Sequence, residues 1–146
     1  LKIKKAGSSE LDKNCFPVIG LIDEWNKDGK IIKGTDKNLG GTMRLGLYEA
    51  KLRNNSAIKN IYKSNMIKER HRHRYEVNIN LMHKFEKKGL MFSGVSPDNQ
   101  LPEIIELKNH PWFIGVQFHP EFKSRPLNPH PLFSSFIKAA KSFNGK

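Results

Sequence analysis

Residues 112–118, with the sequence Trp-Phe-Ile-Gly-Val-Gln-Phe, form an apolar run that ends at His119-Pro120-Glu121. A short apolar run bounded by turn-forming residues is typical of a buried strand. Pro120 disfavours helical backbone angles at His119, so we expect the chain to leave the strand in an extended conformation. The end of a strand is also where a rigid scaffold presents side chains to a functional site. The run therefore predicts a buried strand with His119 and Glu121 at its exit.

The spacing of His119 and Glu121 allows the carboxylate to fold back onto the imidazole. A carboxylate that accepts a hydrogen bond from one ring nitrogen fixes the tautomer and leaves the other nitrogen to act as a base. The alternative interpretation is that His119 satisfies a backbone group and that Glu121 is solvated. A His-x-Glu spacing alone does not identify a catalytic motif, so both interpretations stay open at this point.

The apolar and β-branched runs, with the turn signals between them, predict a strand-rich α/β domain. We expect strands at residues 16–25, 39–52, 69–78, 90–96, 102–108 and 112–118. Helices are expected at residues 55–64, 79–89 and 130–143. Asn55 or Ser56 is the expected N-cap of the first helix, and Gly89 the stop of the second. Residues 26–38 are expected to form an exposed hairpin or loop, and the sequence shows no internal domain boundary.

The run at residues 69–78, Glu-Arg-His-Arg-His-Arg-Tyr-Glu-Val-Asn, alternates with the period of a strand. One face of this strand holds three arginines, namely Arg70, Arg72 and Arg74. The other face holds His71, His73, Tyr75 and Val77. Because a guanidinium group binds a carboxylate through two parallel hydrogen bonds, one arginine is a candidate receptor for a substrate carboxylate. The other two arginines are expected to be solvated side chains of an edge strand. Histidines two residues apart on a strand, with no third ligand nearby, do not predict a metal site.

Cys15 is the only cysteine, which suits a reducing cytoplasm. A cysteine nucleophile needs a turn that exposes the sulfur, and the residues around Cys15, Lys-Asn-Cys-Phe-Pro, lack flanking glycines. We therefore expect a half-buried thiol at the entrance of a strand. The glycines of residues 40–46, Gly-Gly-Thr-Met-Arg-Leu-Gly, either allow close approach of a ligand or bend a strand. They do not form a phosphate-binding loop, because the Gly-Lys-Ser/Thr element is missing.

The chain of 146 residues carries a net charge of +12, from 26 Lys and Arg against 14 Asp and Glu. Such a charge raises the possibility of a nucleic-acid surface, but the lysines are scattered along the chain, which favours a compositional bias. No apolar run approaches the roughly 20 residues of a membrane span. The basic N-terminus has no apolar segment behind it, so we do not expect it to be a secretory signal. We expect a protein without membrane contact, and no nucleic-acid partner.

Three runs together resemble one family: Asn-Leu-Gly-Gly-Thr-Met-Arg-Leu-Gly (38–46), Glu-Arg-His-Arg-His-Arg-Tyr-Glu-Val-Asn (69–78) and the segment from Asn109 to Ala140. They are similar to the C-terminal part of the CTP synthase family, within its class I glutamine amidotransferase domain. The His-Pro-Glu end fits any class I amidotransferase, whereas the first two runs are more specific. The resemblance covers essentially the whole chain, and residues 26–38 are the least alike.

The resemblance implies a partial class I glutamine amidotransferase fold, with a central, mainly parallel sheet flanked by helices. Residues 1–146 would form the C-terminal portion of the amidotransferase domain. In the family, a cysteine attacks the side-chain amide of glutamine, a thioester forms, and the released ammonia reaches a synthase domain. There, ATP activates UTP for amination to CTP. The resemblance thus implies the function of a glutamine-hydrolysing ligase of pyrimidine biosynthesis, with glutamine as a substrate.

The resemblance also implies roles for four residues. His119 resembles the catalytic base, and Glu121 the residue that orients it. Arg74, the arginine before Tyr-Glu-Val, resembles a contact to the carboxylate of glutamine. Glu10, in Gly-Ser-Ser-Glu-Leu, resembles the glutamate of a segment that holds the substrate.

The chain departs from the family pattern at the nucleophile, which lies in a Gly-x-Cys-x-Gly elbow upstream of the Gly-Ser-Ser-Glu-Leu segment. Cys15 is not in such an elbow, so we expect a fragment that is inactive alone. No cofactor is expected within this chain, and ATP and Mg²⁺ would belong to the synthase domain. The whole protein is expected to be a cytoplasmic homo-oligomer. A catalytically degenerate amidotransferase-like domain and a basic nucleic-acid-binding module are the alternative functions.

Overall fold

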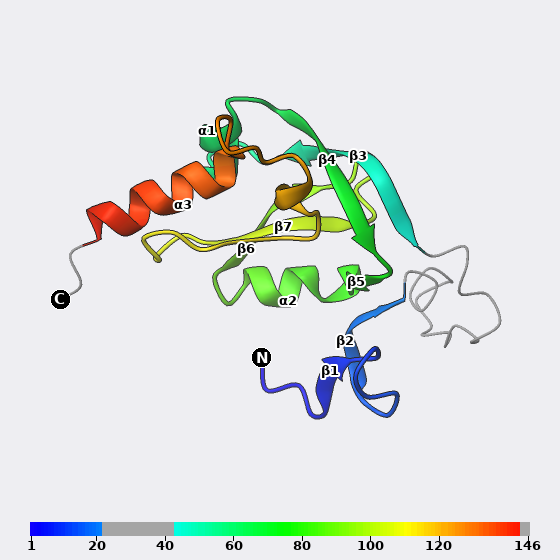
Figure 1. Ribbon diagram of the computed structural model, residues 1–146. Coiled ribbons are helices and arrows are strands. Elements are labelled where there is room, and N and C mark those ends of the chain that lie inside the picture. The colour runs from blue at the N-terminus through cyan, green and yellow to red at the C-terminus, as the bar shows by residue number, and fades with distance from the viewer. Residues whose placement is uncertain (22–42, 144–146) are drawn as a thin grey trace.

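The computed structural model describes residues 1–21 and 43–143, in which strands and helices are mixed (Figure 1). The strands are β1 (Ala6–Ser8), β2 (Phe16–Leu21), β3 (Arg44–Leu52), β4 (Met66–His73), β5 (Tyr75–Val77), β6 (Leu90–Val95), β7 (Pro102–Leu107) and β8 (Ile114–Val116). The helices are α1 (Ala57–Tyr62), α2 (Met82–Glu86), α3 (Pro131–Ser142) and the short 3-10 helices η3 (Ile79–Leu81) and η4 (Pro120–Phe122). The predicted loop at 26–38 lies outside the described residues, as do positions 22–25 and 39–42 of two predicted strands.

The described strands form two sheets, with the orders β1-β2-β5 and β4-β3-β6-β7-β8. Within the described residues only β1 and β2 pair in parallel, and every other pair is antiparallel. The prediction of a mainly parallel sheet is therefore wrong for this part of the chain. The physical reason lies in the connections: the short links from β6 to β7 and from β7 to β8 cannot hold the dozen residues that a parallel crossover needs.

The run at 69–78 is a strand as predicted, but it breaks at Arg74 into β4 and β5, which belong to different sheets. Along β4, exposed and buried residues alternate strictly, with His71 on the buried side. Beyond the break the buried position moves to Glu76, so Tyr75 and Val77 do not continue the face of His71. The break therefore changes the phase of the strand by one residue, which sends the side chains to opposite faces.

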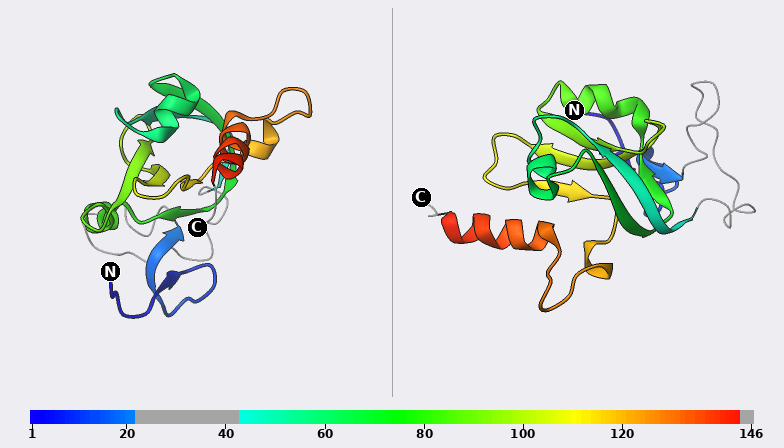
Figure 2. Two further views of the ribbon diagram at one scale, coloured as in Figure 1. Left: turned by 90° about the vertical axis from the view of Figure 1, so that its left-hand side faces the viewer. Right: turned by 90° about the horizontal axis from the view of Figure 1, so that it is seen from above.

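The five-stranded sheet is strongly curved, as the two views of Figure 2 show. Its edge strands are β4 and β8. After β8, the Gln117 amide donates a hydrogen bond to the Glu103 carbonyl oxygen in β7 at 2.9 Å. Two residues later, the His119 amide donates to the Arg70 carbonyl oxygen in β4 at 2.8 Å. The segment after β8 thus crosses from one edge of the sheet to the other. This crossing brings His119 and η4 to β4, an edge strand of the sheet that the described residues form.

The hydrophobic core lies between the curved sheet and the helices α1 and α3. Its buried residues are Ala50, Leu52, Ile58, Ile67, Ile104, Phe118 and Leu132. The Ser56 hydroxyl caps α1 as predicted, and the Glu106 carboxylate also accepts hydrogen bonds from the first helical amides. Gly89, with a positive φ of 91°, ends the segment after α2 as predicted. No helix in the described residues is long and apolar enough to cross a membrane.

Candidate active site

His119 and Glu121 form a close pair at the point where the chain reaches β4. The Glu121 carboxylate lies 2.7 Å from His119 Nδ1. The imidazole stacks on the Phe122 ring, with 5.0 Å between the ring centroids and 15° between the planes. The extended backbone of His119 and the first-turn proline of η4 explain this geometry, because together they turn Glu121 back toward the ring. The local sequence therefore builds the pair within four residues.

The electrostatics of the pair favour an ionised carboxylate. The slight burial of Glu121 raises its pKa, but the hydrogen bond and the charge of His119 outweigh this effect and hold the pKa below its usual value. In the neutral imidazole, a carboxylate at Nδ1 favours the tautomer in which Nδ1–H donates to Glu121 and Nε2 has the lone pair. Among the described residues no polar group contacts Nε2. The side chain of His119 is 34% exposed, so a reactant can approach this nitrogen.

Arg74 lies at the break between β4 and β5 and is half-buried. Arg70 and Arg72 are exposed on the edge strand, as predicted for two of the three arginines. The residue after Arg74, Tyr75, pairs with Leu21 at the C-terminal end of β2. Since β4 rises about 3.3 Å per residue, Arg74 lies up to about 13 Å along the chain from the Arg70 carbonyl that binds His119.

Glu10 is exposed and follows β1, with its amide donating to the Ser8 hydroxyl oxygen at 3.3 Å. Because β1 and β2 run in parallel, Glu10 lies toward the same end of the three-stranded sheet as the Leu21–Tyr75 pair. The topology therefore places Glu10 and Arg74 at one end of this sheet. No contact within the described residues joins either of them to His119 or Glu121.

A buried polar group, missed by the sequence analysis, lies beneath β4 and centres on Arg44. We call it the Arg44 cluster, and its members are Arg44, His71, His73, Glu76, Glu103 and Gln117. Arg44 Nη1 lies 2.7 Å from Glu103 and 3.3 Å from Glu76, so two carboxylates share one guanidinium. Gln117 donates to Glu76 at 2.6 Å, and the rings of His71 and His73 are linked by a hydrogen bond of 2.7 Å.

The charges of the Arg44 cluster are set by burial. Burial raises the pKa of Glu103 to about 7, although Arg44 opposes the shift. Burial and the nearby charge of Arg44 lower the pKa of His71 to about 3 and that of His73 to about 4, so both rings are neutral at pH 7. The histidines are thus structural in this cluster. Within residues 1–21 and 43–143, no group of three His, Cys, Asp or Glu side chains is arranged to hold a metal ion.

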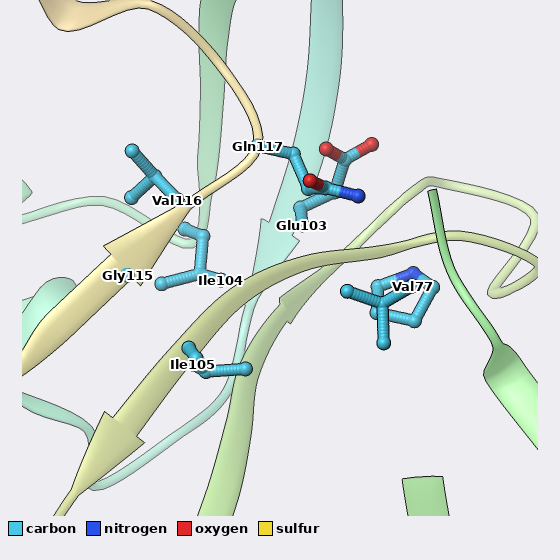
Figure 3. Close-up of a pocket in the computed structure, with 8 residues that line it drawn as sticks. Val77, Glu103, Ile104, Ile105, Gly115, Val116 and Gln117 are labelled. Carbon is cyan, nitrogen blue, oxygen red and sulfur yellow. The ribbon is translucent and has the colours of Figure 1, made fainter. Parts of the chain in front are cut away.

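A cavity of about 140 Å³ lies beside the Arg44 cluster (Figure 3). It is lined by Val77, Pro102, Glu103, Ile104, Ile105, Gly115, Val116 and Gln117. Figure 3 shows the polar side chains of Glu103 and Gln117 close together, apart from the apolar side chains of Ile105 and Val116. Ligand sites need polar groups that are available to fix a ligand's orientation, whereas these two interact with Arg44 and Glu76. The cavity is therefore not a candidate substrate site.

Cys15 is half-buried in the turn before β2. A Cβ atom added to Gly7 would lie 3.0 Å from the Cβ and 3.2 Å from the sulfur of Cys15, so the thiol packs tightly against β1. None of the contacts in the described residues joins Cys15 to His119. The structure thus agrees with the predicted half-buried thiol at a strand entrance.

A histidine whose Nδ1 contacts a carboxylate at a strand exit is an arrangement that can assist a nucleophile in hydrolysis or group transfer. The chain belongs to the class I glutamine amidotransferase family, whose sequence profile, "Glutamine amidotransferase class-I", matches residues 15–139. This membership confirms the family predicted from the three sequence runs.

The relatives that this chain matches are CTP synthases, and the solved structure is described as a CTPS glutaminase domain. A CTP synthase of Pelagibacter ubique is 78% identical over 142 residues, which are 97% of this chain and 26% of that protein. A CTP synthase of Zymomonas mobilis is 60% identical over 139 residues, 94% of this chain and 26% of that protein. The chain spans about a quarter of the length of these relatives. A structure described as the Trypanosoma brucei CTPS glutaminase domain with bound acivicin matches with a TM-score of 0.78 and 34% identity, over 97% of this chain and 53% of that one.

Proposed function

We propose that this chain is part of a CTP synthase and provides the His–Glu half of its glutaminase site. The observation that carries the proposal is the pair itself, with Glu121 2.7 Å from Nδ1 and Nε2 without a polar neighbour among the described residues. The identity of 78% to a CTP synthase supports the choice of parent enzyme. The whole protein then hydrolyses glutamine and uses the ammonia, with ATP and Mg²⁺, to convert UTP into CTP in a separate synthase domain. It acts in the cytoplasm as a homo-oligomer.

In the proposed reaction, His119 moves protons at Nε2. It accepts the proton of a cysteine thiol while the sulfur attacks the amide carbon of glutamine. When the C–N bond breaks, the imidazolium returns this proton to the leaving nitrogen, and ammonia and a thioester result. His119 then takes a proton from water as the water oxygen attacks the thioester, which releases glutamate and restores the thiol. Glu121 stabilises the imidazolium in both steps.

Two further residues complete the proposed glutamine site. Arg74 suits the α-carboxylate of glutamine, because its guanidinium can form two parallel hydrogen bonds with it. Glu10 suits the α-ammonium group, and its place at the same end of the three-stranded sheet supports a shared substrate contact.

The nucleophile of the proposed reaction is a cysteine outside these residues, because Cys15 packs against β1. The 146 residues alone therefore have no glutaminase activity in this proposal.

Glutamate release from glutamine by the full-length protein tests the proposal. His119→Ala should lower the rate by a factor of about 10³ or more, as expected when the base of such a triad is removed. His83→Ala, which removes an exposed histidine of α2, is the matched control and should keep the wild-type rate. Equal rates for His119→Ala and His83→Ala would show that His119 has no catalytic role.

A further inference from the structure

Hydrogen bonds and an ion pair connect the turn that contains His119 to three consecutive residues of β4. The His119 amide donates to the Arg70 carbonyl oxygen at 2.8 Å. The Lys123 ammonium donates to the Lys68 carbonyl oxygen at 2.6 Å and lies 3.2 Å from the Glu69 carboxylate. The turn is therefore held at its first residue by the backbone and at its last residue by a lysine side chain.

Glu69 is an unusual anchor because it is ionised inside the protein and only 2% exposed. One oxygen, Oε1, accepts hydrogen bonds from the Tyr62 hydroxyl at 3.0 Å and from His130 Nε2 at 3.2 Å, besides its contact with Lys123. Burial raises the pKa of Glu69, but the hydrogen bonds from His130, Tyr62 and Lys123 outweigh it and lower the pKa below its usual value. A buried charge requires a partner of opposite sign, and Lys123 provides it.

The turn between the two anchors is stiff. The Phe122 amide donates to the His119 carbonyl oxygen and the Lys123 amide to that of Pro120, both at 3.1 Å. The imidazole of His119 stacks on Phe122. A shift of Lys123 away from β4 is therefore transmitted through Phe122 to the ring of His119.

We propose that Lys123 is a positioning residue for glutamine hydrolysis: its ion pair with Glu69 fixes the turn that aims His119 at the reacting thiol. This proposal rests on the proposed function of His119. Among the described residues, the hydrogen bond and the ion pair of the Lys123 side chain are with Lys68 and Glu69, not with His119 or Glu121, so Lys123 acts through the geometry of the turn. Since a misplacement of about 1 Å can cost up to about 10²-fold in rate, loosening this anchor should lower kcat. The KM for glutamine should change little, because neither Arg74 nor Glu10 belongs to this turn.

The test measures glutamine hydrolysis by the full-length protein with three lysine variants. Lys123→Met, which removes the charge and keeps much of the side-chain length, should lower kcat about tenfold or more with KM within about twofold. Lys123→Arg keeps the charge and the donors and should recover kcat to within about threefold of wild type. Lys138→Met, on the exposed side of α3, is the control and should behave as wild type. CTP formation from added ammonia should be unchanged in all three.

A second measurement asks whether Lys123 acts through Glu69. Glu69→Gln should lower kcat as Lys123→Met does, and the double variant should be no worse than the more damaging single variant, because both remove the same ion pair. Additive losses would overturn the proposal. So would a Lys123→Met variant with wild-type kcat, or one that loses ammonia-driven and glutamine-driven activity equally. These results are separate from the His119→Ala test: loss of activity in His119→Ala with wild-type kcat in Lys123→Met refutes the positioning role alone.

Discussion

At the scale of single residues, the Glu121 carboxylate determines which nitrogen of His119 carries the proton. Its contact with Nδ1 at 2.7 Å fixes the tautomer in which Nε2 has the lone pair. Glu121→Gln removes the charge but keeps the size of the side chain. We expect kcat for glutamine hydrolysis to fall by a factor of about 10² or more, since the neutral amide neither fixes the tautomer nor stabilises the imidazolium. Steady-state kinetics of glutamate release check this, and an unchanged kcat would contradict it.

Glu103 gives a pH-dependent prediction. Its pKa is raised from 4.5 to about 7 in the folded protein, so its ionisation destabilises the fold progressively between pH 4.5 and pH 7. The Glu103→Gln side chain cannot ionise, so the variant does not lose this stability as the pH rises. From pH 5 to pH 8 the free energy of unfolding of the variant should therefore rise relative to wild type, by up to about 3 kcal/mol. His71 and His73, with pKa values of about 3 and about 4, stay neutral in the folded protein from pH 5 to pH 8.

Denaturant unfolding of both proteins at the two pH values measures this difference. A constant difference between pH 5 and pH 8 would show that Glu103 does not titrate in this range.

The residues of the site differ in how far the sequence reveals them. His119 and Glu121 could be predicted as a pair because proline and the end of an apolar run act within a few residues. Arg44 and Glu103 meet only in the folded chain, 59 positions apart, and no local pattern marks them as partners. The one feature of the sequence that could have indicated a buried ion pair is the position of Arg44, a charged residue at the start of a strand with apolar residues.

At the scale of secondary-structure elements, close packing between β6 and β7 gives a prediction. A Cβ atom at Gly94 would lie 2.6–3.0 Å from three atoms of Ile104, a core residue that is 1% exposed. Gly94→Ala should destabilise the protein by about 1–3 kcal/mol, because the added methyl overpacks the core. Thermal unfolding measures the effect. Combined with Ile104→Val, which trims the obstructing side chain, the loss should be smaller than the sum of the two single losses, and strict additivity would speak against this clash.

The elements that could be predicted are those with local signals. Ser56 and Gly89 mark helix ends through their own side chain and backbone angle, so α1 and the segment around α2 were expected near their observed places. The strand β1 was missed, since its three residues, Ala6–Ser8, have no apolar pattern and are ordered by pairing with β2. The break at Arg74 was missed too, because it depends on the two sheets that the strand joins.

At the scale of the whole molecule, two surfaces leave apolar side chains exposed. The outer side of β3 exposes Leu45 and Leu47, and α3 exposes Phe133, Phe136 and Ile137. Along α3, Leu132 is the one fully buried residue. Exposed apolar patches of this kind favour association. We expect the isolated 146-residue chain to self-associate in solution.

Surface variants test this expectation. Leu45→Glu places a carboxylate opposite Arg72, and Ile137→Lys adds a charge to α3, so the double variant should lower light scattering at equal concentration. Its unfolding temperature should match that of the parent chain. A parent chain that is a soluble monomer with a single cooperative unfolding transition would contradict the prediction.

The sheet direction of the whole fold could not be derived from single runs. The family resemblance supplied the fold class, whereas the short connections around β7 determine that its neighbours run antiparallel.

If His119 serves glutamine hydrolysis within a CTP synthase, its loss should change the ratio of glutamine-driven to ammonia-driven CTP formation. CTP formation by the full-length protein is measured with glutamine and with ammonia as nitrogen source, for wild type and His119→Ala. The rate of glutamine-driven formation should fall by a factor of about 10³ or more in the variant, and ammonia-driven formation should stay near the wild-type rate. Equal losses with both nitrogen sources, or retained glutamine-driven formation, would contradict this role of His119.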